Sequence, residues 1–422
     1  MIKVLRLKDI GIFKGGLTYS PENICDKEEG ILVLRSSNIQ NSKISLLDNV
    51  YVNCEVSSDL LIKKGDLLIC SRNGSANLVG KTAQIEDDIH ATWGAFMMIF
   101  RTSYNSRYTY YLLNDSITKN KGLFSTSTIN QLTNSMLGNI YVNFELDISE
   151  QEKIARYLDT KVGEIDQKVS LIEKKIERYQ LLKKSIINKV VTKGLHPEAS
   201  LKESQISWLG QIPAHWEEKR LKDLGYFYGG LSGKSGEDFQ NEDEDVIKPF
   251  IPYTNILNNF YVNPEVVKYV VINDNESQNT IQKGDLLFLM SSEDYESIAK
   301  ASVVNEEVDE LYLNSFCKGM KITNKQIYSP FLCYLLSNND CRDSLRFEAQ
   351  GFTRINIKTG KVACASIIIP PLSEQQEIAS YLDQKCADID AIIANCTAQI
   401  EKYKTLKRAL INEVVTGQRT IE

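Results

Sequence analysis

A segment of 45 residues occurs twice in this chain of 422 residues. Residues 148–192 align without a gap with residues 372–416, and 21 of the 45 aligned pairs are identical. The start of each half repeats as well, since RLKDIGIFKGGLT (residues 6–18) matches RLKDLGYFYGGLS (residues 220–232) at nine of 13 positions. Further on, KKGDLLIC in the first half is matched by QKGDLLFL in the second half, whereas the parts between these matching segments diverge. The sequence therefore predicts a tandem of two equivalent units.

Each copy of the repeated segment has the pattern of a long amphipathic helix. The capping-box motif S-x-x-E/Q opens the copies at Ser149 and Ser373, and the helix-stopping glycines Gly194 and Gly417 follow them. Between these signals, apolar residues alternate at spacings of three and four, which predicts a heptad stripe that pairs with another helix. The expected stripe residues are Leu158, Val162, Ile165, Val169, Ile172, Ile176 and Tyr179 in the first copy, and Leu382, Cys386, Ile389, Ile393, Cys396, Ile400 and Tyr403 in the second.

The two stripes are predicted to pair with each other as an antiparallel coiled coil. About 40 helical residues form a rod of roughly 60 Å, longer than a domain of ~150 residues is wide, so packing of each rod along its own domain is the weaker alternative. Two equivalent units commonly pack about a two-fold axis, and an axis across the rods makes them antiparallel. Lys183 and Lys407 interrupt the stripes at matching positions, where Leu182 and Leu406 are expected to take their place.

The predicted fold class is α+β, a tandem of two mixed α/β domains that are each followed by a long helix. Strand-like segments such as ILVLRS, DLLICS and DLLFLM lie in both domains beside helical ones such as YTYYLLNDSITKN. The expected boundaries are a first domain at residues 1–147, a helix at 148–195, a linker at 196–207, a second domain at 208–371 and a second helix at 372–422.

The composition argues against several classes of protein. The nine cysteines are scattered without a C-x-x-C pair and the three histidines stand far apart, so we expect a reduced, cytoplasmic chain without a metal site. There is no apolar run of 18 residues, no G-x-G-x-x-G and no P-loop, so we expect neither a membrane span nor a nucleotide cofactor. A cysteine–histidine nucleophile pair stays open on spacing alone, but no motif singles one out. The sequence therefore predicts a binding protein without a catalytic site.

The charge is uneven along the chain. The net charge of −6 speaks against a protein that wraps nucleic acid by bulk charge. Lys and Arg minus Asp and Glu gives 15 − 15 = 0 for residues 1–147, 11 − 7 = +4 for residues 148–195 and 16 − 23 = −7 for residues 208–371. Any contact with DNA must therefore come from local clusters.

Several loops combine arginine or lysine with short polar side chains beside glycine. Arginine binds guanine edges, Asn and Gln bind adenine edges, and Ser, Thr and Lys hold phosphates, although ordinary turns use the same residue types. The candidate DNA contacts are Arg35, Ser37, Asn38, Ser71, Arg72, Asn73, Lys81, Thr128, Asn130, Gln131, Thr254, Asn255, Ser291, Ser292, Gln350, Thr353, Arg354 and Lys358.

Taken together, these segments resemble the specificity subunit of type I restriction–modification systems. The resemblance is carried by LSEQQEIASYLDQKCADID after IIIPP, by WLGQIPAHWEEKRLKDL, by KKGDLLICSRNGSANLVGK and by GFTRINIKTGKV, and it covers essentially the whole chain. It implies a non-catalytic subunit for host defence with two target-recognition domains, each of which reads half of a bipartite DNA target, while the helix pair sets the spacing.

The same resemblance implies the partners. Two methylation subunits would bind this chain and carry the restriction subunits, and S-adenosylmethionine, ATP and Mg would bind to those partners, with no cofactor in this chain. The alternative from another class is a coiled-coil scaffold without sequence-specific DNA contacts. A self-contained restriction enzyme is disfavoured, because the chain has neither methyltransferase nor helicase motifs.

Overall fold

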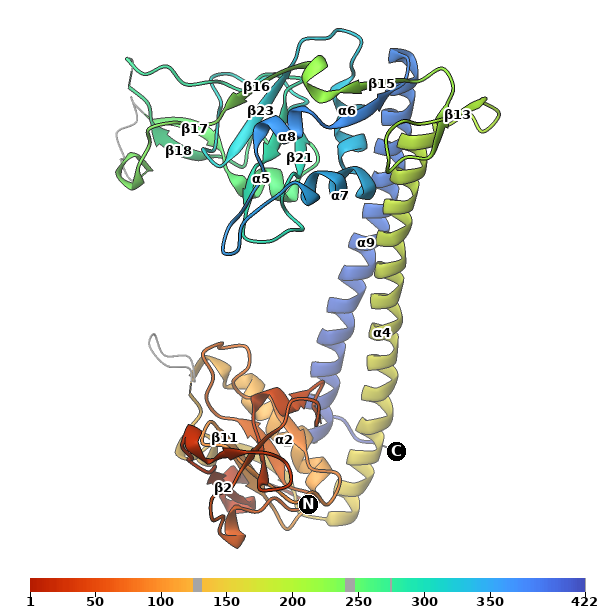
Figure 1. Ribbon diagram of the computed structural model, residues 1–422. Coiled ribbons are helices and arrows are strands. Elements are labelled where there is room, and N and C mark those ends of the chain that lie inside the picture. The colour runs from red at the N-terminus through yellow and green to blue at the C-terminus, as the bar shows by residue number, and fades with distance from the viewer. Residues whose placement is uncertain (124–130, 240–246, 274, 422) are drawn as a thin grey trace. The chain divides into compact units, whose positions relative to one another are not determined.

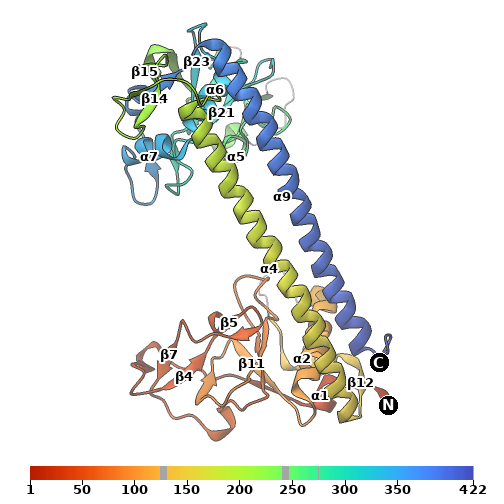
Figure 2. The ribbon, with the colours of Figure 1, turned by 90° about the vertical axis from the view of Figure 1, so that its right-hand side faces the viewer.

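The computed structural model describes residues 1–123, 131–239, 247–273 and 275–421 (Figures 1 and 2). The chain forms two compact units. The first unit comprises Met1–Glu173 with Thr397–Glu422, and the second comprises Lys174–Cys396. Both boundaries fall inside a long helix, so each unit contains a part of α4 (Ile148–Lys193) and a part of α9 (Leu372–Val415).

The first unit is built on small sheets. One antiparallel sheet has the order β2 (Ile12–Gly15), β11 (Met97–Arg101), β8 (Leu67–Cys70), β9 (Thr82–Gln84). A second sheet has the order β10 (Ala91–Trp93), β4 (Ile31–Leu34), β7 (Val50–Val52), β3 (Ile24–Cys25), with β10 and β4 parallel. Antiparallel pairs are formed by β1 (Ile2–Arg6) with β12 (Tyr141–Glu145) and by β5 (Ile39–Gln40) with β6 (Lys43–Ile44). The helices include α1 (Leu7–Ile10), α2 (Ser106–Lys119) and α3 (Asn134–Gly138).

The second unit repeats this plan. Its antiparallel sheet has the order β16 (Gly225–Gly229), β23 (Cys317–Ile322), β19 (Leu286–Leu289), β21 (Ala301–Val303), and another sheet has the order β18 (Lys268–Val271), β17 (Ile247–Ile251), β22 (Tyr312–Leu313). Antiparallel pairs are β15 (Glu217–Arg220) with β25 (Ser366–Ile369), β13 (Leu201–Glu203) with β14 (Gln211–Pro213), and β20 (Ser291–Ser292) with β24 (Ile355–Asn356). The helices include α5 (Tyr253–Asn258), α6 (Ser329–Leu336), α7 (Asn339–Phe347) and α8 (Thr359–Ala363).

The repeated KGD motif forms the same turn at the start of a central strand in both units. Asp66 and Asp285 are each 2% exposed, and each carboxylate accepts the backbone N–H three residues earlier, at 2.8 and 3.0 Å. Gly65 and Gly284 adopt φ of +92° and +91°, a left-handed conformation that glycine reaches without strain. The motif is therefore repeated because the turn requires its glycine and its buried carboxylate.

The helices begin two residues earlier than N-caps at Ser149 and Ser373 predict. α4 begins at Ile148, so Ser149 lies inside its first turn, and the carboxylate of Asp147 accepts the Ser149 N–H at 2.9 Å. This hydrogen bond holds the pKa of Asp147 below its usual value, because it favours the charged form. The prediction of a Ser149 cap is therefore wrong, since an acceptor stands closer to the helix start.

The glycine stops at the other ends are confirmed. Gly194 and Gly417 have φ of +72° and +73° and follow the ends of α4 and α9. Their N–H groups donate to the carbonyls of Val190 and Val414, at 2.9 and 3.2 Å. A left-handed glycine that returns its N–H to the last turn is a common helix C-terminus.

Within each unit, α4 and α9 run antiparallel and share a core. In the first unit Leu158 and Ile165 lie in one apolar cluster with Leu410, and in the second unit Val191 lies in one with Leu382. All the expected stripe residues are buried or half-buried, which confirms the stripe. Two helices cover each other on one side only, so stripe residues that touch no globular part, such as Ile172 in the first unit and Ile176 in the second, stay half-buried.

The two lysines in the stripes form ion pairs across the helices. Lys407 Nζ lies 2.7 Å from Asp166 in the first unit, and Lys183 Nζ lies 2.6 Å from Asp390 in the second. Leu182 and Leu406 are 46% and 53% exposed, so the expectation that they replace the lysines is wrong. A lysine stem is long enough to cover apolar surface while its ammonium group reaches a carboxylate at the edge of the stripe.

Repeated polar residues join each helix to its own globular part. Gln151 and Gln375 are fully buried and accept the backbone N–H of Asn105 and Tyr328, at 3.0 and 2.8 Å. Their side-chain amides donate to backbone carbonyls, including that of Pro370 at 2.8 Å. Part of the identity between the helices therefore serves attachment to the domains.

An aspartate about two turns further along each helix makes a second joint. Asp159 accepts the Tyr111 hydroxyl at 2.7 Å, and Asp383 accepts the hydroxyls of Tyr334 and Tyr261 at 2.7 and 2.8 Å. Burial, and next the hydrogen bonds to Asp383, raise the pKa of Tyr334 and of Tyr261, so both hydroxyls stay protonated as donors.

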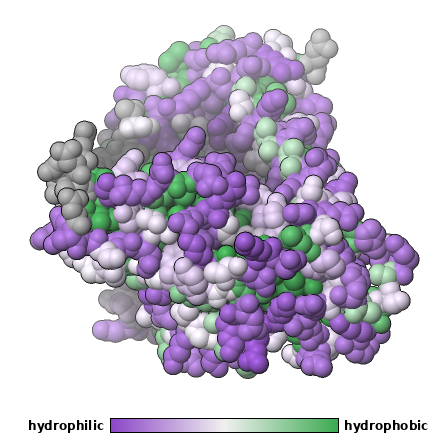
Figure 3. All heavy atoms as spheres, turned by 90° about the horizontal axis from the view of Figure 1, so that it is seen from above, coloured by the Kyte–Doolittle hydropathy of each residue, from purple (hydrophilic) through white to green (hydrophobic). Residues whose placement is uncertain are grey.

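The surface drawn in Figure 3 is mainly hydrophilic, with hydrophobic residues in separate groups. In the part of the chain that the structure describes, every helix is too short or too polar to cross a membrane.

Candidate nucleic-acid interface

The first unit contains a cleft of about 960 Å³ that brings several predicted DNA contacts together. Arg35, Ser37, Arg72 and Asn73 all line it. They come from two loops, one after β4 and one after β8, that lie far apart in the sequence. The other lining residues are Leu17, Thr18, Tyr19, Ser36, Asp48, Gly74, Gly94, Ala95, Phe96 and Met97.

A close approach of two backbone segments shapes this cleft. The Leu17 N–H donates to the Trp93 carbonyl at 2.7 Å, and a Cβ added to Gly16 would lie 2.1 Å from the Gly94 carbonyl oxygen. Only glycine fits at this distance. The second unit has the same arrangement, since a Cβ on Gly230 would lie 2.1 Å from the Asn314 oxygen. The repeated GGL motif is therefore a packing requirement beside the cleft.

Arg72 lies over an exposed aromatic ring at this cleft. Its guanidinium carbon is 5.4 Å from the ring centroid of Phe96, within the range of a cation–π contact. The N–H groups of Ser71 and Arg72 both donate to the Phe96 carbonyl, at 3.0 and 3.1 Å. Gln131 forms an isolated β-bridge with Arg72. Backbone and side-chain contacts thus hold Arg72 against Phe96.

The other cleft candidates are partly engaged. An Arg35 terminal nitrogen lies 3.0 Å from Asp48, and Asn73 donates to the Ser36 hydroxyl at 3.3 Å. Among the described residues, Arg35 Nε and Ser37 Oγ are buried without a hydrogen-bond partner. Buried polar atoms usually have a partner, so these two leave hydrogen-bonding capacity at the cleft unmet.

Asn38 and Asn255 lie inside the protein, at 0% and 1% exposure. The Asn38 amide donates to the carbonyls of Ser45 and Asp48, at 2.9 and 3.1 Å. The Asn255 amide donates to two loop carbonyls in the same way, at 2.7 and 2.9 Å. In this conformation both side chains hold a loop closed.

Lys81 and its counterpart Lys300 also brace loops. Lys81 Nζ donates to the Ile39 carbonyl at 3.4 Å, and Lys300 Nζ donates to the Leu257 carbonyl at 2.8 Å. Burial, and next the charge of Arg342, lower the pKa of Lys300.

In the second unit, two of the predicted residues, Arg354 and Ser291, contact each other. Arg354 Nε donates to the Ser291 hydroxyl at 2.9 Å, and the Arg354 guanidinium carbon lies 4.1 Å from the ring centroid of Phe316. Ser292 is buried and accepts the Tyr253 hydroxyl at 3.1 Å. The remaining candidates Thr254, Gln350, Thr353 and Lys358 are exposed. Thr128 and Asn130 lie outside the described residues.

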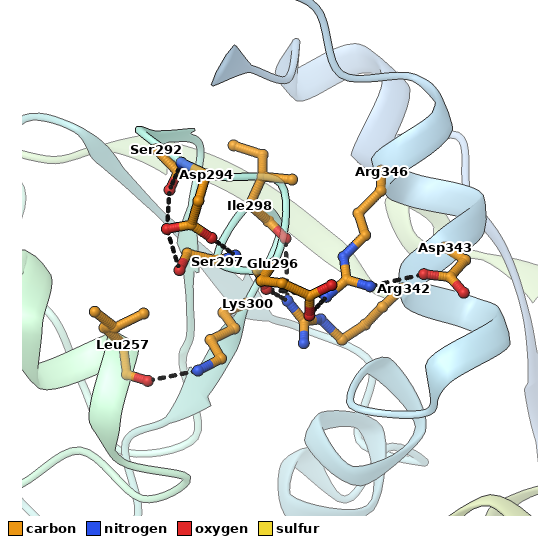
Figure 4. A network of polar contacts seen from close by, with 10 residues as sticks. All are labelled: Leu257, Ser292, Asp294, Glu296, Ser297, Ile298, Lys300, Arg342, Asp343 and Arg346. Carbon is orange, nitrogen blue, oxygen red and sulfur yellow. Dashed lines mark hydrogen bonds and ion pairs between the residues drawn. The ribbon is translucent and has the colours of Figure 1, made fainter. Parts of the chain in front are cut away.

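The loop after β20 is anchored by the polar network in Figure 4. Arg342 donates to the carbonyls of Glu296 and Ile298. Arg346 bridges the Glu296 and Asp343 carboxylates at 2.9 and 2.7 Å. Burial, and next the charge of Arg346, lower the pKa of Arg342 to about 10. These arginines therefore support the loop that follows Ser291 and Ser292.

The exposed rings of Phe96 and Phe316 are not among the residues predicted from the sequence. They are 61% and 46% exposed, at equivalent places before β11 and β23. The sequence signal for them is a pair of matching segments, GAF (residues 94–96) and NSF (residues 314–316), each of which ends in phenylalanine directly before an apolar strand. A phenylalanine beside an apolar strand is normally assigned to the core, which hides this signal.

Two buried cysteines are poorly suited to act as nucleophiles. Burial raises the pKa of the Cys317 and Cys341 thiols to about 12, which disfavours the nucleophilic thiolate. Over the described residues, no group of three or more His, Cys, Asp or Glu side chains is placed to hold a metal ion.

Comparisons with known proteins agree with this architecture. The family model described as type I restriction modification DNA specificity domain matches residues 2–178 and 213–402. The MjaX type I restriction enzyme specificity subunit of Methanocaldococcus jannaschii is 26% identical, over 99% of this chain and 93% of that protein. The EcoKI specificity subunit of Escherichia coli strain K12 is 21% identical, over 96% of this chain and 87% of that protein.

A solved structure shares the fold. It comes from work on complex assembly and conformational transition of the type I R-M system, and it superposes with a TM-score of 0.72 at 15% identity, over 99% of this chain and 98% of the other. The two family matches each include one globular part and the beginning of the helix that follows it. The chain therefore belongs to the type I restriction–modification DNA specificity family, with two copies of its domain in tandem.

Proposed function

We propose that the chain is the non-catalytic DNA-reading subunit of a type I restriction–modification complex. Each unit binds one half of a bipartite target, and the paired helices set the gap between the halves. The observation that carries this proposal is that the two units share the same backbone turns but differ in the side chains on them. Both units present the same turns beside the GGL motif, but Arg35 in the first unit is replaced by Pro252 in the second. Equivalent backbones with different side chains suit recognition of different sequences.

Exposed leucines on the helices support a docking role for them. Leu171, Leu181, Leu182 and Leu406 are 66%, 59%, 46% and 53% exposed, outside the stripes that pair the helices. Apolar side chains that remain exposed on a helix suit contact with a partner protein. We propose that two methylation subunits bind there and carry the restriction subunits. S-adenosylmethionine, ATP and Mg would bind to those partners, in the cytoplasm.

Selection from randomised DNA tests the proposal. The full chain, assembled with its methylation subunit, is incubated with random duplexes, and the bound fraction is sequenced. We expect enrichment of two short defined segments separated by a fixed number of undefined positions. Equal recovery of all sequences would favour a scaffold instead, and one continuous motif would contradict separate binding by the two units.

A further inference from the structure

Both units place an arginine within cation–π distance of an exposed phenylalanine. Arg72 lies over Phe96 in the first unit and Arg354 lies over Phe316 in the second, at 5.4 and 4.1 Å from the ring centroids. Both arginines are exposed, as are both rings. A cation–π contact with a ring restricts the positions that a guanidinium group adopts and so helps to orient its N–H donors.

The two phenylalanines occupy equivalent turns in the two units. Phe96 precedes β11 and Phe316 precedes β23, the equivalent strands of the two antiparallel sheets. Each turn closes with a hydrogen bond between residues three apart, from Met97 N–H to the Gly94 carbonyl and from Cys317 N–H to the Asn314 carbonyl, at 2.8 and 3.0 Å. The ring is thus presented by matching backbone geometry.

The arginines, in contrast, come from segments that are not equivalent, since Arg72 follows β8 and Arg354 precedes β24. The gapless match of GDLLICSRNG with GDLLFLMSSE places Ser291 where the first unit has Arg72. β20, which contains Ser291, pairs with β24, and Arg354 directly precedes β24. Its Nε donates to the Ser291 hydroxyl at 2.9 Å. The second unit therefore rebuilds the stacked arginine from the neighbouring strand.

We propose that Arg72 and Arg354 are equivalent specificity-determining residues, each of which binds a guanine in the half-site of its unit. This inference rests on the proposed function and names the base that the two stacked arginines recognise. Guanine presents O6 and N7 as adjacent acceptors in the major groove, and a planar arginine fork binds both at once.

The donors required for this contact are available. The Arg72 guanidinium makes no hydrogen bond or ion pair with the described residues, and Arg354 uses only Nε, on Ser291. The two terminal nitrogens of each arginine therefore remain for a base. A phosphate contact requires positive charge but no fixed plane, so it would give no reason to rebuild the stack from another strand.

Base analogues test this inference on the selected target. Each guanine of the target is replaced in turn by 7-deazaguanine, which lacks the N7 acceptor, and the affinity of the assembled complex is measured. We expect one guanine in each half-site at which the replacement weakens wild-type binding roughly five- to 150-fold. Arg72→Ala should abolish the sensitivity in one half-site only, and Arg354→Ala should abolish it in the other only.

Two further variants serve as controls. Arg6→Ala removes a half-buried arginine whose side chain pairs with Asp9, outside the residues that line the cleft, and should leave both sensitivities to 7-deazaguanine unchanged. Arg72→Lys keeps the charge but replaces the planar fork by an ammonium group, which still donates to guanine, and should therefore reduce the sensitivity to 7-deazaguanine without abolishing it. The inference would be overturned if 7-deazaguanine weakened binding by Arg72→Lys, or by both alanine variants, as much as it weakens binding by the wild type.

Failure of this inference is distinguishable from failure of the proposed function. A bipartite target whose guanines all tolerate 7-deazaguanine would overturn the guanine contact and leave a DNA-reading subunit. Absence of any selected sequence would overturn the proposed function itself.

Discussion

Neighbouring glycines in the first unit differ sharply in the space around them. A Cβ on Gly16 would lie 2.1 Å from a carbonyl oxygen of the turn that presents Phe96, whereas a Cβ on Gly15 meets nothing within 4 Å. A larger residue at position 16 would therefore force this turn to move, and the Phe96 ring beneath Arg72 would move with it.

Substitution of these two glycines tests that coupling. Gly16→Ala should destabilise the first unit by about 1–3 kcal/mol and weaken binding to one half-site. Gly15→Ala, the matched control, should change stability by less than ~0.5 kcal/mol. Thermal unfolding and DNA affinity of the full chain provide the measurements. Equal effects of the two substitutions would show that the close approach does not shape the cleft.

Single residues were the least predictable level of this protein. Four of the candidate contacts line one cleft, but Asn38 and Asn255 are buried and hold loops, although the sequence patterns around all six look alike. Asparagine closes turns with the same amide that binds adenine, so composition does not separate the two roles. Only the three-dimensional positions of the acceptor carbonyls do so.

Among the secondary-structure elements, the long helices combine pairing with attachment. The apolar stripes pair the helices, the lysines at positions 183 and 407 add cross-helix ion pairs, and Gln151 and Gln375 bind the globular parts. The pattern of three and four predicted the stripe correctly because an apolar seam imposes that period. The ion pairs across the helices and the hydrogen bonds of Gln151 and Gln375 to the globular parts could not be predicted, because they depend on which residue, distant in the sequence, lies next to each side chain in the fold.

Alanine substitutions along the stripe should show where the pairing is strongest. Leu382 is fully buried in the core of the second unit, whereas Ile176 in the same unit is half-buried. Leu382→Ala should therefore cost about 3 kcal/mol, and Ile176→Ala only about 1 kcal/mol. Denaturant unfolding of the full chain checks both values. A larger loss for Ile176→Ala would contradict the described packing.

For the whole molecule, two equivalent units on one pair of repeated helices explain the internal repeat. The tandem was predictable because the identical positions are those that the fold requires, namely the GGL approach, the KGD turn and the helix joints. The strand order was not predictable, because short strands such as β3 and β20 have two residues each and carry no period of their own.

A domain exchange, scored by sequencing of methylated bases, tests the central claim that the two units bind their half-sites separately. Residues 1–147 are replaced by the corresponding segment of a relative, with both helices unchanged, and the chimaera is produced with its methylation subunit. One segment of the methylated target should change, while the other segment and the gap stay as in the wild type. A change in both segments, or in the gap, would contradict the account.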